Sequence, residues 1–333
     1  MPEIEFRQAI RDAIDEEMAR DPSVILLGQD VGAAGGVFQV TRGLFEKHGP
    51  LRVVDTPISE LALAGAAFGA AVTGLRPIIE IMFGDFMGLA MDSLVNQSAK
   101  YWYLSNGRVS VPLVVRCSVG GGGRFGPIHS QSPASWLMSV PGLKIVAPST
   151  PADASGLLRS AIRDDNPVIF LEHKRLYALK GEAGEGTVPL VTANVLRVGR
   201  DITIVTALRQ VHDAIAASET LTAHGIEAEV IDLRTLRPFD LPCLLRSVGK
   251  TGRLVVVEEG PRSGGWAAEI LASVCEELLG EVKAAWRITG PDLPLPYSPL
   301  QEDRAIANAD RIATDVVRRL DVSVPTSVRS ASG

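Results

Sequence analysis

The chain has 333 residues, of which 46% are hydrophobic and 22% are charged, with a formal net charge of -6 and a pI near 5.5. This length and apolar content are enough for the cores of two domains of ordinary size. The acidic balance provides no basic stripe that could neutralise phosphates, so nucleic acid and acidic lipid surfaces are excluded as expected partners.

The sequence predicts neither export nor membrane insertion. The N-terminus is acidic and amphipathic, without the basic start and apolar run of a secretory signal. The longest nearly apolar stretch, 61–75, is shorter than the ~20 residues that a spanning helix needs, so it predicts a buried helix. The cysteines, Cys117, Cys243 and Cys275, have no CxxC or zinc-type spacing. Reduced thiols in a cytoplasmic protein are therefore expected.

Short β-branched runs alternate with segments of helical period along the chain. The first series predicts strands at 24–28, 52–54, 77–83, 112–116, 143–149 and 167–172. The second series predicts strands at 201–207, 226–233 and 252–260, with helices at 209–223 and 265–280. This alternation is typical of α/β domains with mostly parallel, helix-covered sheets. We expect one domain at 1–185, a connector at 186–199, a second domain at 200–322 and a disordered tail at 323–333.

Two small-residue segments in the first domain are unusual. The predicted helix 58–73 carries Gly65 and Gly69 at a spacing of four, which permits close packing inside the domain or across a subunit boundary. Four consecutive glycines, 120–123, follow a predicted buried strand. They indicate either unusual dihedrals and a close ligand approach, or a mobile surface loop.

Few side chains in the first domain are suited to acid and base chemistry. Glu60 opens the small-residue helix, where an acid is most often a partner of the helix dipole. The apolar residues that follow it instead favour a buried carboxyl group with a raised pKa, able to donate a proton. His129 follows the glycines among polar neighbours, where it is either structural or a group for proton transfer. Phe86 is expected at the carboxyl edge of the sheet or in the core.

Two segments that contain these candidate residues are highly specific: DTPISE at 55–60 and HSQ at 129–131. Together with several other short segments, they closely resemble the β subunit of the heterotetrameric E1 component of 2-oxo acid dehydrogenase complexes, a family that includes pyruvate, branched-chain and acetoin dehydrogenases. The resemblance extends over nearly the whole chain. No dinucleotide-type or P-loop glycine motif competes with it.

The resemblance implies a pyrimidine-binding domain followed by a transketolase-type C-terminal domain, in an α2β2 enzyme that uses thiamine diphosphate. Magnesium and the diphosphate would be held by α, and a lipoyl-bearing E2 would receive the acyl group. Glu60 falls on the glutamate that hydrogen-bonds the cofactor's pyrimidine, and His129 on the histidine that faces the substrate. Phe86 falls on the aromatic residue that stacks on the pyrimidine, with Met82 and Leu61 as further cofactor contacts. A structural potassium ion would be bound by the backbone carbonyls of Leu113, Ala161, Asp164 and Asn166.

One position departs from the family, and two other functions stay open. Gln29 stands where the family usually has a glutamate of an acidic path between two active sites, and an amide cannot ionise. Pyruvate is the favoured substrate, but an acetoin-cleaving or acyloin-forming β subunit is an alternative. A non-catalytic subunit that docks α onto E2 is a second alternative, disfavoured because docking needs neither Glu60 nor His129.

Overall fold

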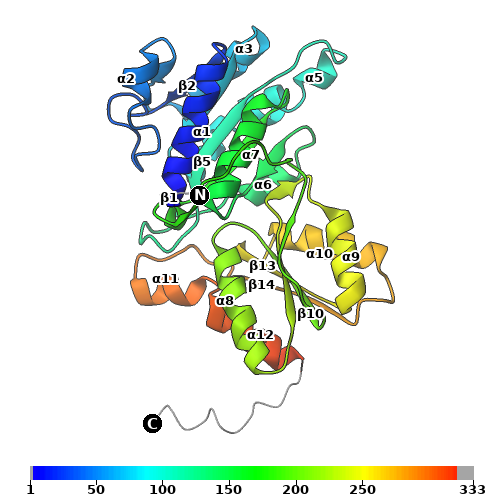
Figure 1. Cartoon of the computed structure of the whole chain (residues 1–333). Coiled ribbons are helices and arrows are strands. Elements are labelled where there is room, and N and C mark those ends of the chain that lie inside the picture. The colour runs from blue at the N-terminus through cyan, green and yellow to red at the C-terminus, as the bar shows by residue number, and fades with distance from the viewer. Residues whose placement is uncertain (1–2, 321–333) are drawn as a thin grey trace. The chain divides into compact units, whose positions relative to one another are not determined.

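The computed structural model describes residues 3–320 and divides the chain into two compact units (Figure 1). Unit 1 comprises Met1–Thr192, Arg234–Phe239 and Pro294–Glu302, and unit 2 comprises the remainder. The expectation for the tail at 323–333 lies outside the described residues. No helix of the described chain is both long and apolar enough to cross a membrane.

Unit 1 is built on a seven-stranded sheet of order β12-β6-β7-β5-β4-β2-β3. All neighbours pair in parallel except β12, which pairs antiparallel with β6 at the edge. The strands are β2 (Val24–Gly28), β3 (Val53–Asp55), β4 (Arg76–Ile81), β5 (Val114–Val119), β6 (Lys144–Val146), β7 (Val168–His173) and β12 (Thr235–Arg237). The six predicted strands are therefore present, and β12 is an addition that comes from a distant part of the chain.

The helices of unit 1 are α1 (Phe6–Arg20), α2 (Leu44–His48), α3 (Glu60–Val72), α4 (Met87–Met91), α5 (Tyr101–Leu104), α6 (Ala134–Met138) and α7 (Pro151–Arg163). Of these, α1 and α7 run along the sheet (Figure 1). Helix α11 (Pro299–Ala305) begins in unit 1, and Glu302 is its last residue in that unit. Helix α1 buries one stripe, including Phe6, Ile10 and Ile14, against the core. Helix α7 begins where the Thr150 side chain accepts the Asp153 N–H. A π-helical turn, η2 (Asp92–Ser98), and the small sheet of β1 (Glu3–Glu5) and β8 (Lys180–Glu182) were not predicted.

Unit 2 contains a five-stranded sheet of order β14-β13-β10-β11-β9, covered by helices. Its strands are β9 (Asn194–Arg197), β10 (Ile202–Thr206), β11 (Ala228–Asp232), β13 (Arg253–Pro261) and β14 (Ala284–Gly290), and its helices are α8 (Gln210–Ala223), α9 (Leu241–Thr251), α10 (Trp266–Glu277) and α12 (Ala309–Arg319). Strand β9 lies in the segment expected to be a connector and pairs antiparallel with β11. The predicted class, two α/β domains with mostly parallel sheets, is confirmed.

The prediction of a wholly buried helix at 61–75 is wrong for the single chain. Helix α3 buries Leu63, Ala64, Ala67 and Ala71, while Leu61 is 55% exposed. One face of α3 packs against β4 and α4. On another side of the helix, Ala62 and Ala66 are exposed, and a side chain at Gly69 would have no neighbouring atom within 4 Å of its Cβ.

Candidate active site

Side chains from three neighbouring strands gather at the carboxyl edge of the unit 1 sheet. Strand β4 leads into Phe83 and Phe86, β5 leads into the glycine-rich loop that ends at His129, and β7 leads into Lys174. Because these strands are parallel, their carboxyl ends lie at the same edge, where α/β proteins bind ligands. The sheet topology therefore brings together residues far apart in the sequence.

His129 packs within a cluster of aromatic rings. Its ring centroid lies 4.7 Å from that of Phe83 and 5.4 Å from that of Phe86, both in edge-to-face contact. Phe83 also contacts Phe86 edge to face, with centroids 6.1 Å apart. Two of the residues singled out from the sequence, Phe86 and His129, are thus neighbours. The ring between them, Phe83, was missed because an aromatic residue after a strand is as typical of a core as of a site.

Lys174 supports this cluster from the end of β7. Its ammonium donates a 2.8 Å hydrogen bond to the His129 carbonyl and lies 5.4 Å from the Phe83 ring centroid. The Lys174 side chain is buried, with 8% of the residue exposed. A buried ammonium needs such polar and cation–π contacts. Sequence reasoning missed Lys174, although its place directly after a buried strand is a signal that could have found it.

Glu60 is the first residue of α3 and is half-buried. The preceding Ser59 caps the helix by accepting the Ala62 N–H at 3.4 Å. The expected full burial of Glu60 is not found in the single chain, since Ile58 and Leu61 beside it are 76% and 55% exposed. Within residues 3–320, no hydrogen bond, ion pair or ring contact joins Glu60 to the His129 cluster. Met82 is half-buried, and its carbonyl accepts the Ser118 hydroxyl.

Three buried polar atoms without a partner in the described chain lie close in sequence to the candidate residues. They are Thr56 Oγ1, Asp85 Oδ2 and Ser130 Oγ. The other carboxylate oxygen of Asp85 accepts both the backbone N–H and the side-chain amide of Gln131. Buried polar atoms nearly always have hydrogen-bond partners. Their position beside Glu60, Phe86 and His129 fits a polar heterocyclic ligand at this edge.

A fully buried charged network lies in the same three strands. The Arg116 guanidinium forms a bidentate pair with Glu172, at 2.7 and 2.9 Å, and donates to Glu80 at 2.8 Å. The Tyr177 hydroxyl donates to Glu172 at 2.9 Å. Burial raises the pKa of Glu172 despite the opposing attraction of Arg116. Tyr177 in turn stacks on Phe38, which contacts Phe83 edge to face, so the network supports the aromatic cluster.

The glycine-rich loop is closely packed, contrary to the alternative of a mobile loop. Gly120 and Gly122 have φ of 86° and 81°, which favours glycine. A Cβ at Gly120 would lie 2.2 Å from the His173 ring, and a Cβ at Gly122 would lie 2.6 Å from Arg175 Cδ. The glycines therefore allow the His173 and Arg175 side chains to approach the loop backbone closely.

Three of the four carbonyls expected to hold potassium, those of Leu113, Ala161 and Asp164, accept hydrogen bonds. Leu113 accepts from the Val168 N–H at 2.8 Å, and Asp164 accepts from the Arg76 guanidinium at 2.7 Å. A carbonyl oxygen has two lone pairs, so these bonds leave room for a cation. The potassium ligands, Leu113, Ala161, Asp164 and Asn166, stay a prediction. Within the described residues, no group of three or more His, Cys, Asp or Glu side chains could hold a metal, and the three cysteines form no disulfide.

The comparisons with known proteins place this geometry in a class. The family model "Transketolase, pyrimidine binding domain" matches residues 2–180, and "Transketolase, C-terminal domain" matches residues 192–312. A solved structure titled "Split gene transketolase, inactive beta4 tetramer" has a TM-score of 0.78 over 96% of this chain and 99% of that one, at 21% identity, which shows the fold alone. The chain is a two-domain protein of the transketolase type.

Three relatives in sequence show which family of transketolase-type proteins the chain belongs to. The acetoin:2,6-dichlorophenolindophenol oxidoreductase subunit beta of Cupriavidus necator is 49% identical, covering 93% of this chain and 95% of that protein. The 2-oxoisovalerate dehydrogenase subunit beta of Bacillus subtilis is 44% identical, covering 94% and 97%. A pyruvate dehydrogenase E1 component subunit beta of Arabidopsis thaliana is 44% identical, covering 95% and 88%. The chain belongs to this family of β subunits, and the resemblance seen in its sequence is confirmed.

Proposed function

We propose that this chain is the β subunit of a cytoplasmic α2β2 enzyme that oxidatively decarboxylates a 2-oxo acid, pyruvate being favoured, and transfers the acyl group to a lipoyl-bearing E2. The observation that carries the proposal is the cluster of His129, Phe83 and Phe86 at the carboxyl edge of a pyrimidine-binding type of domain. Membership of the β-subunit family supports it.

Thiamine diphosphate, when bound, supplies the electron sink that decarboxylation needs. In this proposal the Glu60 carboxyl group would hold a proton at the pyrimidine ring, and association with α would complete the burial of its side chain. The Phe86 ring packs against the pyrimidine, with Met82 and Leu61 as apolar contacts. His129 faces the substrate, where an imidazole can move a proton near neutral pH. Magnesium is held by α, and potassium by the carbonyls named above.

Exposed apolar side chains of unit 1 support the need for partner chains. Large apolar residues that are more than half exposed include Leu61, Leu89, Trp102, Tyr103 and Leu104. Trp102, Tyr103 and Leu104 are consecutive, and an exposed apolar patch is typical of a surface that is covered in an assembly. Leu61 directly follows Glu60, so a partner chain that covers Leu61 would also enclose the candidate proton donor.

Acetoin cleavage is the second candidate function, favoured by the 49% identity to the Cupriavidus necator subunit. A dye-reduction assay of this chain purified with its α subunit, magnesium and thiamine diphosphate distinguishes the two. Initial rates with pyruvate, branched 2-oxo acids and acetoin are measured over the same range of concentrations. We expect the highest kcat/KM with pyruvate. A higher kcat/KM with acetoin would contradict the first candidate and support acetoin cleavage. If no substrate led to dye reduction, the result would support a non-catalytic docking subunit.

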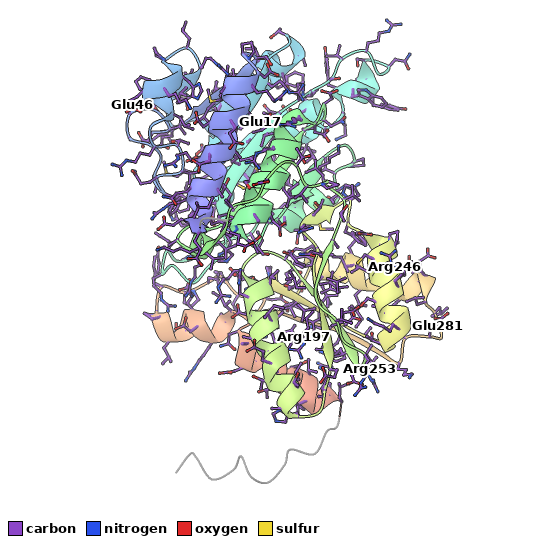
Figure 2. All side chains as sticks on the ribbon, viewed as in Figure 1. Glu17, Glu46, Arg197, Arg246, Arg253 and Glu281 are labelled. Carbon is purple, nitrogen blue, oxygen red and sulfur yellow. The ribbon has the colours of Figure 1, made fainter. Side chains whose placement is uncertain are left out.

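The first variant to test is Glu60→Gln in the reconstituted pair. An amide cannot exchange the proton that the proposal assigns to Glu60, so turnover should fall at least about a hundredfold, as loss of a general acid or base does. Assembly with α, measured by size-exclusion chromatography, should be unchanged. The control is Glu46→Gln, an exposed acid on α2 that points away from the sheet (Figure 2). Turnover within a few fold of the unmodified pair would contradict the role of Glu60.

A further inference from the structure

The glycine-rich loop that leads to His129 is held by a carboxylate about 180 residues further along the chain. Glu302, on α11, is fully buried. Its carboxylate accepts the backbone N–H of Gly122 at 2.8 Å and that of Arg124 at 3.2 Å, and it pairs with the Arg124 guanidinium at 2.7 Å. Charge-assisted hydrogen bonds of this kind are roughly twice as strong as neutral ones.

The loop conformation that Glu302 holds is a strained one. Arg124 has a φ of 64°, in the left-handed region that residues other than glycine rarely adopt. Such a conformation persists only where the surroundings fix it, and it is common at functional sites. Two further contacts come from the segment that carries Glu302. The Pro299 carbonyl accepts the Arg124 guanidinium at 3.1 Å, and the Tyr297 ring lies so close to Gly126 that a Cβ there would be 2.2 Å away.

The opposite end of the same loop is held at the candidate site. The Gly126 carbonyl accepts the His129 N–H, and the His129 carbonyl accepts the Lys174 ammonium. The path from Glu302 to His129 therefore runs through a short loop fixed at both ends. A shift at Arg124 would move Gly126 and, through it, the His129 ring relative to Phe83 and Phe86.

We propose that Glu302 is a positioning residue, which fixes the loop of Gly122 and Arg124 so that His129 is held in its working place. This inference rests on the role proposed for His129. Glu302 itself does not touch the candidate site. Its effect is exerted through the loop backbone.

The test uses Glu302→Gln in the full chain purified with α. The glutamine side chain has nearly the same size as Glu302, but one carboxylate oxygen is replaced by an NH₂ group, which cannot accept a hydrogen bond. At least one of the three hydrogen bonds that Glu302 accepts from Gly122 and Arg124 is therefore lost. Trypsin cleavage after Arg124, followed by mass spectrometry, should be about tenfold faster or more, because proteolysis reports the population of the opened loop. Cleavage after Arg108, in a separate exposed turn, is the internal reference, and Glu46→Gln is the matched control variant.

Activity provides the second readout. With Glu302→Gln, kcat/KM for the oxo acid should fall about tenfold, while the thiamine diphosphate concentration for half-maximal activity stays unchanged. A loop as resistant to trypsin as the unmodified one would overturn the proposal, as would an opened loop with unchanged kcat/KM. His129→Gln separates this inference from the proposed function: if it leaves turnover intact, the role of His129 fails whatever the cleavage shows. If Glu302→Gln does not fold, Arg124→Lys, which keeps the trypsin site, must show the same changes in cleavage and kcat/KM.

Discussion

Arg116 shows how much a single buried charge contributes to unit 1. Its guanidinium pairs with both Glu172 and Glu80 in the interior of the sheet. Ionised groups at such burial are stable only when they are paired and hydrogen-bonded. Removing the arginine would leave two neighbouring buried carboxyl groups without a counter-charge in the interior of the sheet.

Arg116→Met should lower the free energy of unfolding by about 3–5 kcal/mol at neutral pH. The loss should also depend on pH. Burial already raises the pKa of Glu172 above its unfolded value, and loss of the Arg116 charge would remove the attraction that opposes this rise. A group with a raised folded pKa contributes stability at low pH that is lost as the pH rises, so the deficit should be greater near about pH 8 than near about pH 5. Urea titrations at both pH values measure it, with Arg108→Met as the control. An equal loss of unfolding free energy at the two pH values would contradict this prediction.

At the scale of elements, the pairing of α1 with α7 covers one face of the unit 1 sheet. Glu17 lies on α1 (Figure 2). Its carboxylate forms ion pairs with the Arg163 guanidinium of α7 at 2.6 Å and with the Arg20 guanidinium at 2.7 Å. Burial of Glu17 opposes ionisation, but the hydrogen bonds from Arg163 and Arg20 outweigh it and lower the pKa of Glu17. This contact therefore joins the two helices through a charged carboxylate.

Glu17→Gln should destabilise the chain by about 1–2 kcal/mol at neutral pH, because hydrogen bonds to a charged group are lost. A group with a lowered folded pKa contributes stability above its unfolded pKa, and this contribution disappears as the pH falls through the folded pKa. The variant and the unmodified chain should therefore differ at about pH 7 and converge at about pH 3. Thermal unfolding followed by circular dichroism checks this. If the difference in stability between the variant and the unmodified chain grew as the pH fell, the lowered pKa of Glu17 would be contradicted.

Regular elements with a clear hydrophobic pattern could be predicted, whereas the pairing of short segments could not. Strands such as β5 and β7 begin with apolar runs, and Phe86 and His129 were singled out as candidates from their places after predicted strands. β12 and Glu302 act only through contacts with residues distant in sequence, so no local pattern marks them. The burial of α3 was overestimated because an apolar helix in sequence does not reveal which chain covers its outer face.

At the scale of the whole molecule, the account requires that the cofactor be held between two chains. Glu60, Leu61 and Phe86 would contact its pyrimidine, and the α subunit would hold the magnesium and the diphosphate. The half-buried Glu60 and the exposed face beside it are consistent with a site that a second chain completes.

Equilibrium binding of thiamine diphosphate with magnesium, measured by titration calorimetry on the purified chain, on α and on the pair, tests this claim most directly. The account predicts saturable binding by the pair and none at micromolar concentration by the chain alone. Micromolar binding to this chain without α would contradict it.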